Sequence, residues 1–182
     1  MRVITGIARG KKLITLEGTD VRPTTDMVKE AIFSIVQFEV AGAKVLDLFA
    51  GSGQLGIEAL SRGASLAVFV DSSSDSVKVT RENLKSTGLA QNSRVVAMDS
   101  FAYLSGCKDE FDIVFIDPPY SKDIINQILP KAVEKVNENG IIICEHDKKD
   151  QLPEEVGDFC RFRTYNYGRI ALTTYRKRDE EE

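Results

Sequence analysis

Four consecutive residues, Asp117-Pro118-Pro119-Tyr120, follow an apolar run and have the types needed to hold a planar amino group. An exocyclic NH₂ on an aromatic ring is a poor nucleophile, because its lone pair is delocalised into the ring. The carboxylate of Asp117 and the main-chain carbonyl of Pro118 can accept its two N–H bonds, which favours positive charge developing on the nitrogen. Proline fixes φ and removes competing N–H donors, and the ring of Tyr120 can stack on a base. The alternative is a proline turn that merely ends a strand.

A glycine loop, VLDLFAGSGQLG at residues 45–56, provides a second site for chemistry. Gly51, Gly53 and Gly56 match GxGxxG between an apolar run and a helical stretch, a pattern that alone permits a dinucleotide. Asp47 stands four residues before Gly51, where its carboxylate can accept hydrogen bonds from an ammonium group but would repel a pyrophosphate. The combination favours S-adenosylmethionine, which carries a cationic sulfonium and an amino-acid end.

Two further acids end the next apolar runs. Asp71 can accept both ribose hydroxyls of the ligand, and Asp99 can accept the adenine amino group, although either acid could simply cap a helix. A sulfonium methyl donor is already activated, so the site needs in-line geometry more than a strong base. We therefore expect S-adenosylmethionine as cofactor, S-adenosylhomocysteine as product, and no metal. The predicted cofactor-binding residues are Asp47, Phe49, Gly51, Ser52, Gly53, Asp71, Ser72, Asp99, Ser100 and Asp117.

The surrounding elements must bring these loops together. Apolar runs at 45–49, 66–70, 95–98, 113–116 and 141–144 predict strands, and helical spacing marks 27–38, 55–60, 74–86 and 124–136, the last ended by Gly140. Continuously apolar strands that alternate with helices indicate a parallel α/β sheet covered on both faces, with ligands bound beyond the carboxyl ends of the strands. Residues 3–8 and 12–16 predict an N-terminal hairpin, and 159–165 and 169–175 predict two antiparallel strands. Thr24 or Thr25 can cap the first helix.

Length and composition indicate one domain. The chain has 182 residues, 42% hydrophobic and 29% charged, and we divide it into an N-terminal extension (1–40), a catalytic core (41–178) and an acidic tail (179–182). It has no apolar run of roughly 18 residues and no signal-peptide pattern. We expect a cytoplasmic monomer that does not engage a membrane.

Basic residues are concentrated near the two ends of the chain, although the net charge is −4. The first sixteen residues carry Arg2, Arg9, Lys11 and Lys12 without an acid, and residues 159–178 are similarly basic. These clusters predict either a phosphate-binding face for nucleic acid or solvated charge on exposed edges, and the sequence does not choose between them.

The segments VLDLFAGSGQLGIEAL and FDIVFIDPPY resemble the class I amino-methyltransferases. The segments MRVITGIARGKKL, VRPTTDMVKEAIFSI and YNYGRIALTTYRK resemble more narrowly the RsmD family, which methylates the N2 amino group of a guanine in small-subunit (16S) ribosomal RNA. The resemblance implies a Rossmann-like, mostly parallel seven-stranded sheet with a reversed last strand. It also implies ribosomal RNA or the assembling small subunit as partner, catalysis at Asp117–Tyr120, and an approach of residues 22–24 to the active site. The predicted substrate-binding residues are Arg9, Lys11, Lys12, Arg22, Pro23, Thr24 and Tyr120.

Other functions stay open at this point. The tetrapeptide holds any planar NH₂, so adenine in nucleic acid or a glutamine side chain in a protein is an alternative acceptor. A nicotinamide-dependent oxidoreductase would use the glycine loop, but it gives no reason for Asp47 or for Asp-Pro-Pro-Tyr. A non-catalytic RNA-binding module would explain only the basic ends of the chain.

Overall fold

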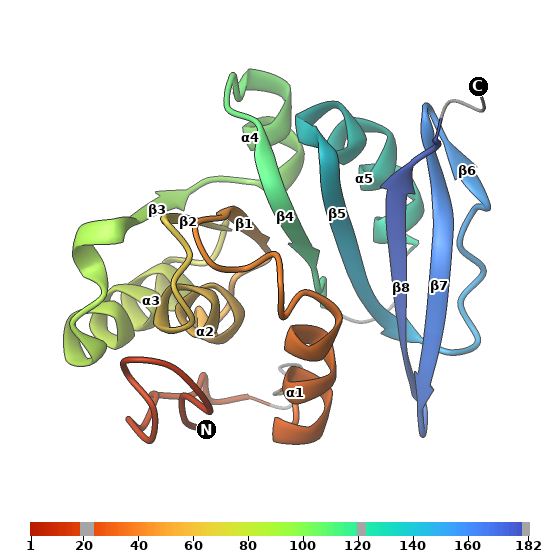
Figure 1. Ribbon diagram of the computed structural model, residues 1–182. Coiled ribbons are helices and arrows are strands. Elements are labelled where there is room, and N and C mark those ends of the chain that lie inside the picture. The colour runs from red at the N-terminus through yellow and green to blue at the C-terminus, as the bar shows by residue number, and fades with distance from the viewer. Residues whose placement is uncertain (19–23, 120–122, 180–182) are drawn as a thin grey trace.

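A central sheet with helices on both faces forms the body of the computed structural model, which describes residues 1–18, 24–119 and 123–179 (Figure 1). The strand order is β3-β2-β1-β4-β5-β8-β7-β6. The strands are β1 (Lys44–Leu48), β2 (Leu66–Asp71), β3 (Ser93–Ala97), β4 (Phe111–Ile116), β5 (Val136–Asp147), β6 (Glu155–Val156), β7 (Phe159–Tyr167) and β8 (Ile170–Lys177).

The direction of the strands confirms the Rossmann-like class I methyltransferase fold. Strands β1 to β5 pair in parallel, whereas β8 runs antiparallel to both of its neighbours, β5 and β7. The two-residue strand β6 adds an eighth strand to the seven expected. Because β1 lies between β2 and β4, the connections diverge at its carboxyl end, where open α/β sheets leave a crevice for ligands.

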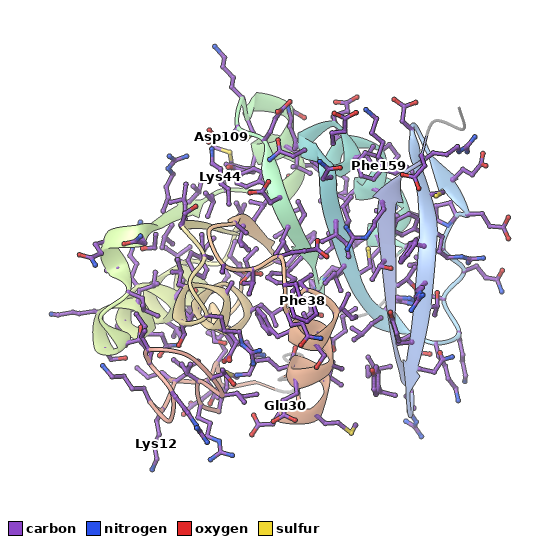
Figure 2. All side chains as sticks on the ribbon, viewed as in Figure 1. Lys12, Glu30, Phe38, Lys44, Asp109 and Phe159 are labelled. Carbon is purple, nitrogen blue, oxygen red and sulfur yellow. The ribbon has the colours of Figure 1, made fainter. Side chains whose placement is uncertain are left out.

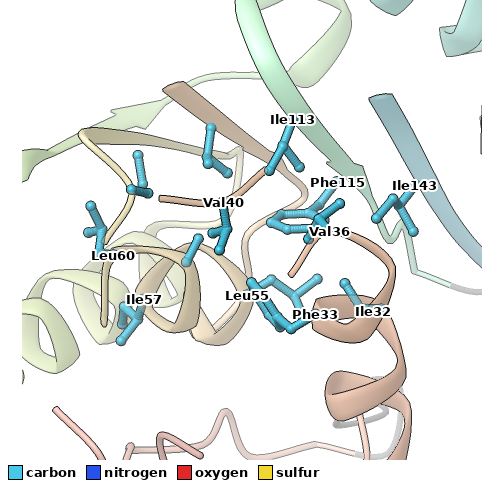
Figure 3. Packing of buried hydrophobic residues seen from close by; sticks show 14 of the residues in the cluster. Ile32, Phe33, Val36, Val40, Leu55, Ile57, Leu60, Ile113, Phe115 and Ile143 are labelled. Carbon is cyan, nitrogen blue, oxygen red and sulfur yellow. The ribbon is translucent and has the colours of Figure 1, made fainter. Parts of the chain in front are cut away.

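In the part of the chain that the structure describes, five α-helices cover the two faces of the sheet: α1 (Asp26–Ile35), α2 (Gln54–Ser61), α3 (Ser74–Thr87), α4 (Ser100–Gly106) and α5 (Ile124–Ala132). The first three pack on one face and the last two on the other, which gives two separate hydrophobic clusters. In the first cluster, the rings of Phe33 on α1 and Phe115 on β4 meet edge to face at 5.7 Å (Figure 3). None of the helices within the described ranges is long and apolar enough to cross a membrane.

The N-terminal extension differs from the predicted hairpin. Instead of strands at 3–8 and 12–16, it is a loop with one antiparallel bridge between Arg2 and Lys12. Its N–H groups pair with helix α2: the two side-chain oxygens of the buried Glu58 accept from Ile4 and Thr5, each at 2.9 Å. In a strand, these N–H groups would donate to the carbonyl oxygens of a neighbouring strand. Here the carboxylate of Glu58 accepts them instead, so this segment does not join a sheet.

The start of β5 also differs from the prediction. The helix predicted for 124–136 ends at Ala132, a 3-10 turn follows, and the strand begins at Val136, so Gly140 lies inside a strand. Val136 pairs with Phe111 of β4, and the register shifts before the next pair. At this bulge a Cβ on Gly140 would lie 3.0 Å from the carbonyl oxygen of Asp112, so glycine permits a close approach.

Candidate active site

A cavity of about 460 Å³ lies beyond the carboxyl ends of the parallel strands. It brings the glycine loop and the Asp-Pro-Pro segment together, as the proposed chemistry requires. The predicted site residues that line it are Asp47, Phe49, Gly51, Ser52, Asp71, Ser72, Asp99, Ser100, Asp117, Pro118 and Pro119. The lining residues that the sequence did not predict are Met1, Thr15, Leu16, Ala50, Gln54, Leu55, Ser73, Ser76 and Glu145.

The three glycines of the loop have different structural roles. Gly51, with φ 58°, faces the cavity. Gly53 is the left-handed N-cap of α2 and packs on Thr80, whose methyl group would lie 2.9 Å from an added Cβ; it is not among the residues that line the cavity. Gly56 packs on Phe69 of β2, whose ring would lie 2.3 Å from an added Cβ. The GxGxxG spacing therefore combines one turn that faces the cavity with two close-packing positions.

Asp47 is a buried carboxyl at the floor of the cavity. Its Oδ2 accepts a hydrogen bond from the main-chain N–H of Gly56 at 3.0 Å. Burial raises the pKa of Asp47 from 3.8 to about 8, an effect that the charge of Asp71 reinforces and the Gly56 bond opposes. A carboxyl whose charged form is destabilised by burial is well suited to a cationic ligand, which would stabilise that charged form.

Asp71 fixes the glycine loop to the end of β2. Its Oδ2 accepts from the N–H of Gly51 at 2.8 Å, and its Oδ1 accepts from the N–H of Ser73 at 2.9 Å. A carboxylate offers about four lone pairs, so these two bonds leave capacity for ligand hydroxyls. Asp99, by contrast, caps helix α4 by accepting from the N–H of Ala102 at 3.0 Å while it also lines the cavity.

The Asp-Pro-Pro segment meets a second carboxyl group, Glu145, which lies near the end of β5. The hydroxyl of Thr24 lies 3.2 Å from Oδ2 of Asp117 and 3.1 Å from Oε2 of Glu145. A hydroxyl has one hydrogen, so Thr24 donates to one of the two carboxyl groups at a time. The predicted approach of Thr24 to this site thus takes the form of a bridge between two acids.

A smaller cavity of about 280 Å³ adjoins the larger one. The two share four lining residues, namely Asp117, Pro118, Pro119 and Glu145. The remaining wall of the smaller cavity comes from the start of α5 and from the segment after β5, and includes Asn126 and His146. The shared residues therefore stand between two neighbouring spaces, one above the glycine loop and one beside α5.

The predicted substrate residues are only partly placed. Arg22, Pro23 and Tyr120 lie outside the described residues. Arg9, Lys11 and Lys12 lie on the N-terminal loop and do not line either cavity. Lys12 points away from the body of the molecule (Figure 2), and Lys11 Nζ lies 3.4 Å from the carbonyl oxygens of Ser86 and Thr87 at the end of α3.

The donor and acceptor groups of the larger cavity fit S-adenosylmethionine. Among its described lining residues there are five acids and no Lys or Arg side chain, which suits a cation and disfavours a pyrophosphate. The Oε1 atom of Gln54 is buried without a hydrogen-bond partner among the described residues, so a ligand donor would satisfy it. Gln54 carries no clear signal in the sequence, whereas Glu145 directly follows the apolar run at 141–144, a signal that the sequence-based prediction did not use.

The family of the chain follows from comparison with known proteins. A family model described as "Conserved hypothetical protein 95" matches residues 1–176. YlbH of Bacillus subtilis, provisionally named an rRNA methyltransferase, is 41% identical over 98% of this chain and 100% of its own length. Ribosomal RNA small subunit methyltransferase D (RsmD) of Escherichia coli is 31% identical over 100% of this chain and 92% of its own length. The chain belongs to the RsmD family.

Solved structures agree with this membership. The Escherichia coli protein yhhF, provisionally named a methyltransferase, superimposes with a TM-score of 0.88 at 29% identity and covers 99% of both chains. A more distant RNA methyltransferase from Salinibacter ruber, solved with S-adenosyl-L-homocysteine, has a TM-score of 0.69 at 18% identity, covering 88% of this chain and 97% of its own. That second likeness shows the fold alone. RsmD membership accounts for the Rossmann-like sheet and for the two facing loops.

Proposed function

We propose that this protein transfers a methyl group from S-adenosylmethionine to the exocyclic N2 amino group of a guanine in small-subunit (16S) ribosomal RNA. The observation that carries the proposal is one acidic cavity that contains both the glycine loop and Asp117-Pro118-Pro119. Membership of the RsmD family supports ribosomal RNA as the substrate class. A protein that acts on ribosomal RNA or on the assembling small subunit works in the cytoplasm, and this location is part of the proposal.

The residues of the larger cavity have separate roles in holding the cofactor. Asp47 and Gln54 are positioned to accept hydrogen bonds from an ammonium group, and Asp71 to accept them from two ribose hydroxyls. Asp99 and Ser100, which also line this cavity, would contact the adenine. When bound, S-adenosylmethionine supplies an electrophilic methyl group on a positively charged sulfur.

Asp117 and Pro118 act on the acceptor. The carboxylate of Asp117 and the carbonyl of Pro118 accept the two N–H bonds of the amino group, which orients its lone pair toward the cofactor cavity. The positive charge that develops on the nitrogen lies beside the Asp117 carboxylate, which stabilises it. The methylated amine then loses a proton to Asp117 or to water, and no stronger base is needed.

The proposal also includes contacts with the substrate by Arg22, Pro23, Thr24 and Tyr120. The ring of Tyr120 would stack on a base that has left its helical stack. Arg9, Lys11 and Lys12 would contact phosphates farther from the reacting atoms. The protein is proposed to act as a monomer.

The test is methyl transfer onto small ribosomal subunits and naked 16S rRNA from a strain that lacks this protein, with DNA and protein extract as other acceptors. We expect one N2-methylguanine, mapped by mass spectrometry. The variant Asp117→Asn should lose roughly 100- to 1000-fold in single-turnover rate while it still binds S-adenosylmethionine. Asp158→Asn, a change at an exposed acid that lines neither cavity, is the control and should retain activity. Methylation of adenine or of a protein glutamine, with guanine untouched, would contradict the proposal.

A further inference from the structure

We infer that Glu145 determines which base is accepted, by receiving the N1–H of guanine while Asp117 holds the N2 amino group. The inference deepens the proposed function and rests on it. It starts from the position of Glu145 at the junction of the two cavities, where it lies with Asp117, Pro118 and Pro119. No other residue of β5 that the structure describes lines both spaces.

Sheet pairing places the two acids side by side. Ile116 of β4 pairs in parallel with Cys144 of β5, and Asp117 and Glu145 are the next residues along the chain from each. The Thr24 hydroxyl contacts both acids, at 3.2 and 3.1 Å. Asp117 and Glu145 can therefore reach neighbouring donors on the edge of one base.

Burial makes Glu145, the more deeply placed of the two acids, selective. Glu145 is only 9% exposed and Thr24 only 5%, so water competes weakly for the acceptor positions. A carboxyl oxygen in such a place favours a donor and disfavours a lone pair, because two lone pairs brought together away from water repel each other and form no hydrogen bond.

The edges of the bases differ in the atom next to the amino group. On the Watson–Crick edge of guanine the N2 amino group adjoins N1–H, a second donor. In adenine the amino group adjoins N1, and in cytosine it adjoins N3, both of which are acceptors. Two adjacent carboxyl acceptors therefore match guanine and repel the other two bases.

The lining of the smaller cavity is rich in hydrogen-bond acceptors, which suits the donors on the edge of a base. Its described lining contains the acids Asp117, Asp123, Glu145, Asp147 and Asp150 and no Lys or Arg, so it does not suit a phosphate. The amide nitrogen of Asn126 donates to Asp123 and to the carbonyl of Gln151, and its buried Oδ1 has no hydrogen-bond partner among the described residues. This orphan acceptor on the same wall is a further place for a donor of the base.

The test replaces Glu145 by the isosteric glutamine, whose amide can donate to a lone pair. Once the modified nucleotide is mapped, small subunits are reconstituted with guanine or 2,6-diaminopurine at that position. Diaminopurine keeps the N2 amino group but presents a lone pair at N1. Single-turnover rates with saturating S-adenosylmethionine give the preference of each enzyme for guanine.

We expect the wild-type protein to prefer guanine by at least about tenfold, and Glu145→Gln to reduce that preference by roughly 10- to 100-fold, as expected for one hydrogen bond to a charged group. Glu138→Gln is the matched control, because Glu138 lies on the same strand, is exposed and lines neither cavity. Its preference should equal that of the wild type.

Failure of this inference and failure of the proposed function give different experimental results. If the wild-type protein methylates guanine but Glu145→Gln slows both substrates equally or leaves the preference unchanged, Glu145 is a structural residue and the inference is overturned. If the wild-type protein transfers no methyl group to guanine in the subunit, the proposed function fails, and the inference fails with it.

Discussion

The buried amide of Asn83 on α3 donates a hydrogen bond to the carbonyl of Ser52 in the glycine loop, at 2.9 Å. The same side chain donates to the carbonyl of Ile14 at 3.0 Å and accepts from its N–H at 2.7 Å. One side chain thus joins the N-terminal extension to the loop that lines the larger cavity. Thr15 and Leu16, which follow Ile14, are themselves part of the cavity wall.

Replacing Asn83 by alanine should disturb both segments. We expect a loss of about 1–3 kcal/mol in the free energy of unfolding for each buried group left unpaired, and a KM for S-adenosylmethionine that rises more than kcat falls. Denaturant unfolding and steady-state kinetics measure the two effects. Asn92→Ala removes a similar bond, to the carbonyl of Ser65, at an exposed site. If both variants behave alike, the link through Asn83 has no role in the cofactor site.

Asp71→Asn should weaken the binding of S-adenosylmethionine by at least about tenfold. The change removes a charged acceptor for the ribose and weakens the bonds that hold Gly51 and Ser73. Isothermal titration calorimetry measures the affinity. Asp75→Asn, an exposed change in the first turn of α3, should bind as the wild type does. A native affinity in Asp71→Asn would remove Asp71 from the cofactor site.

The pKa of Asp47 predicts how the stability of the protein without its cofactor changes with pH. Because this pKa is raised from 3.8 to about 8, the folded state holds a proton that the unfolded state releases. Its contribution to stability is therefore complete below about pH 4 and is lost progressively as the pH rises toward 8. Denaturant unfolding across this range should show the decline in the wild type and a smaller decline in Asp47→Asn. Equal slopes in the two proteins would show that Asp47 titrates normally.

Gly56→Ala should destabilise the fold by about 1–3 kcal/mol through overpacking, since the new methyl group would meet the buried ring of Phe69. Gly106→Ala is the control. Gly106 ends a helix, and no atom lies within 4 Å of an added Cβ, so that change should be neutral or mildly stabilising. Thermal unfolding distinguishes the two, and an unchanged transition in Gly56→Ala would mean that α2 can shift away from β2.

Neutralising Arg9, Lys11 and Lys12 together should lower the affinity for 16S rRNA and flatten its dependence on salt. The log–log slope should fall by roughly 0.7 for each phosphate that the variant no longer neutralises. Filter binding at several salt concentrations gives the slope. A variant with Lys108, Lys131 and Lys148 neutralised removes the same charge elsewhere. An unaltered slope in the first variant would show that the N-terminal loop does not touch phosphate.

Much of the fold followed from local patterns in the sequence. The apolar runs that became β1, β2 and β4 are buried on both faces of the sheet, so hydrophobicity alone marked them. Thr25 caps the start of α1, as expected, and Gly88 caps the end of α3. The predictions of N-terminal strands and of a helix reaching residue 136 were wrong. The side chain of Glu58 and the pairing of Val136 with Phe111 override local preference there.

The site was predictable where chemistry depends on adjacent residues. Asp117 and its two prolines carry their signal within one short motif. Glu145, Gln54 and Asn83 do not, because each acquires its role from the surroundings that distant elements provide. Glu145 could have been noticed as an acid that directly follows the apolar strand run, in the same position as Asp117 relative to its own strand.

Strand β8 has a consequence for the order of events during synthesis. It is inserted between β5 and β7 although it is translated after both. Until residues 170–177 leave the ribosome, the backbone edge of β5 that carries Glu145 has no neighbour on that side, and β7 cannot join the sheet. A nascent chain that stops before β8 would expose an open strand edge, which favours aggregation. The part of the smaller cavity's wall that Glu145 and Ile170 provide is therefore completed late in translation, after the glycine loop has been made.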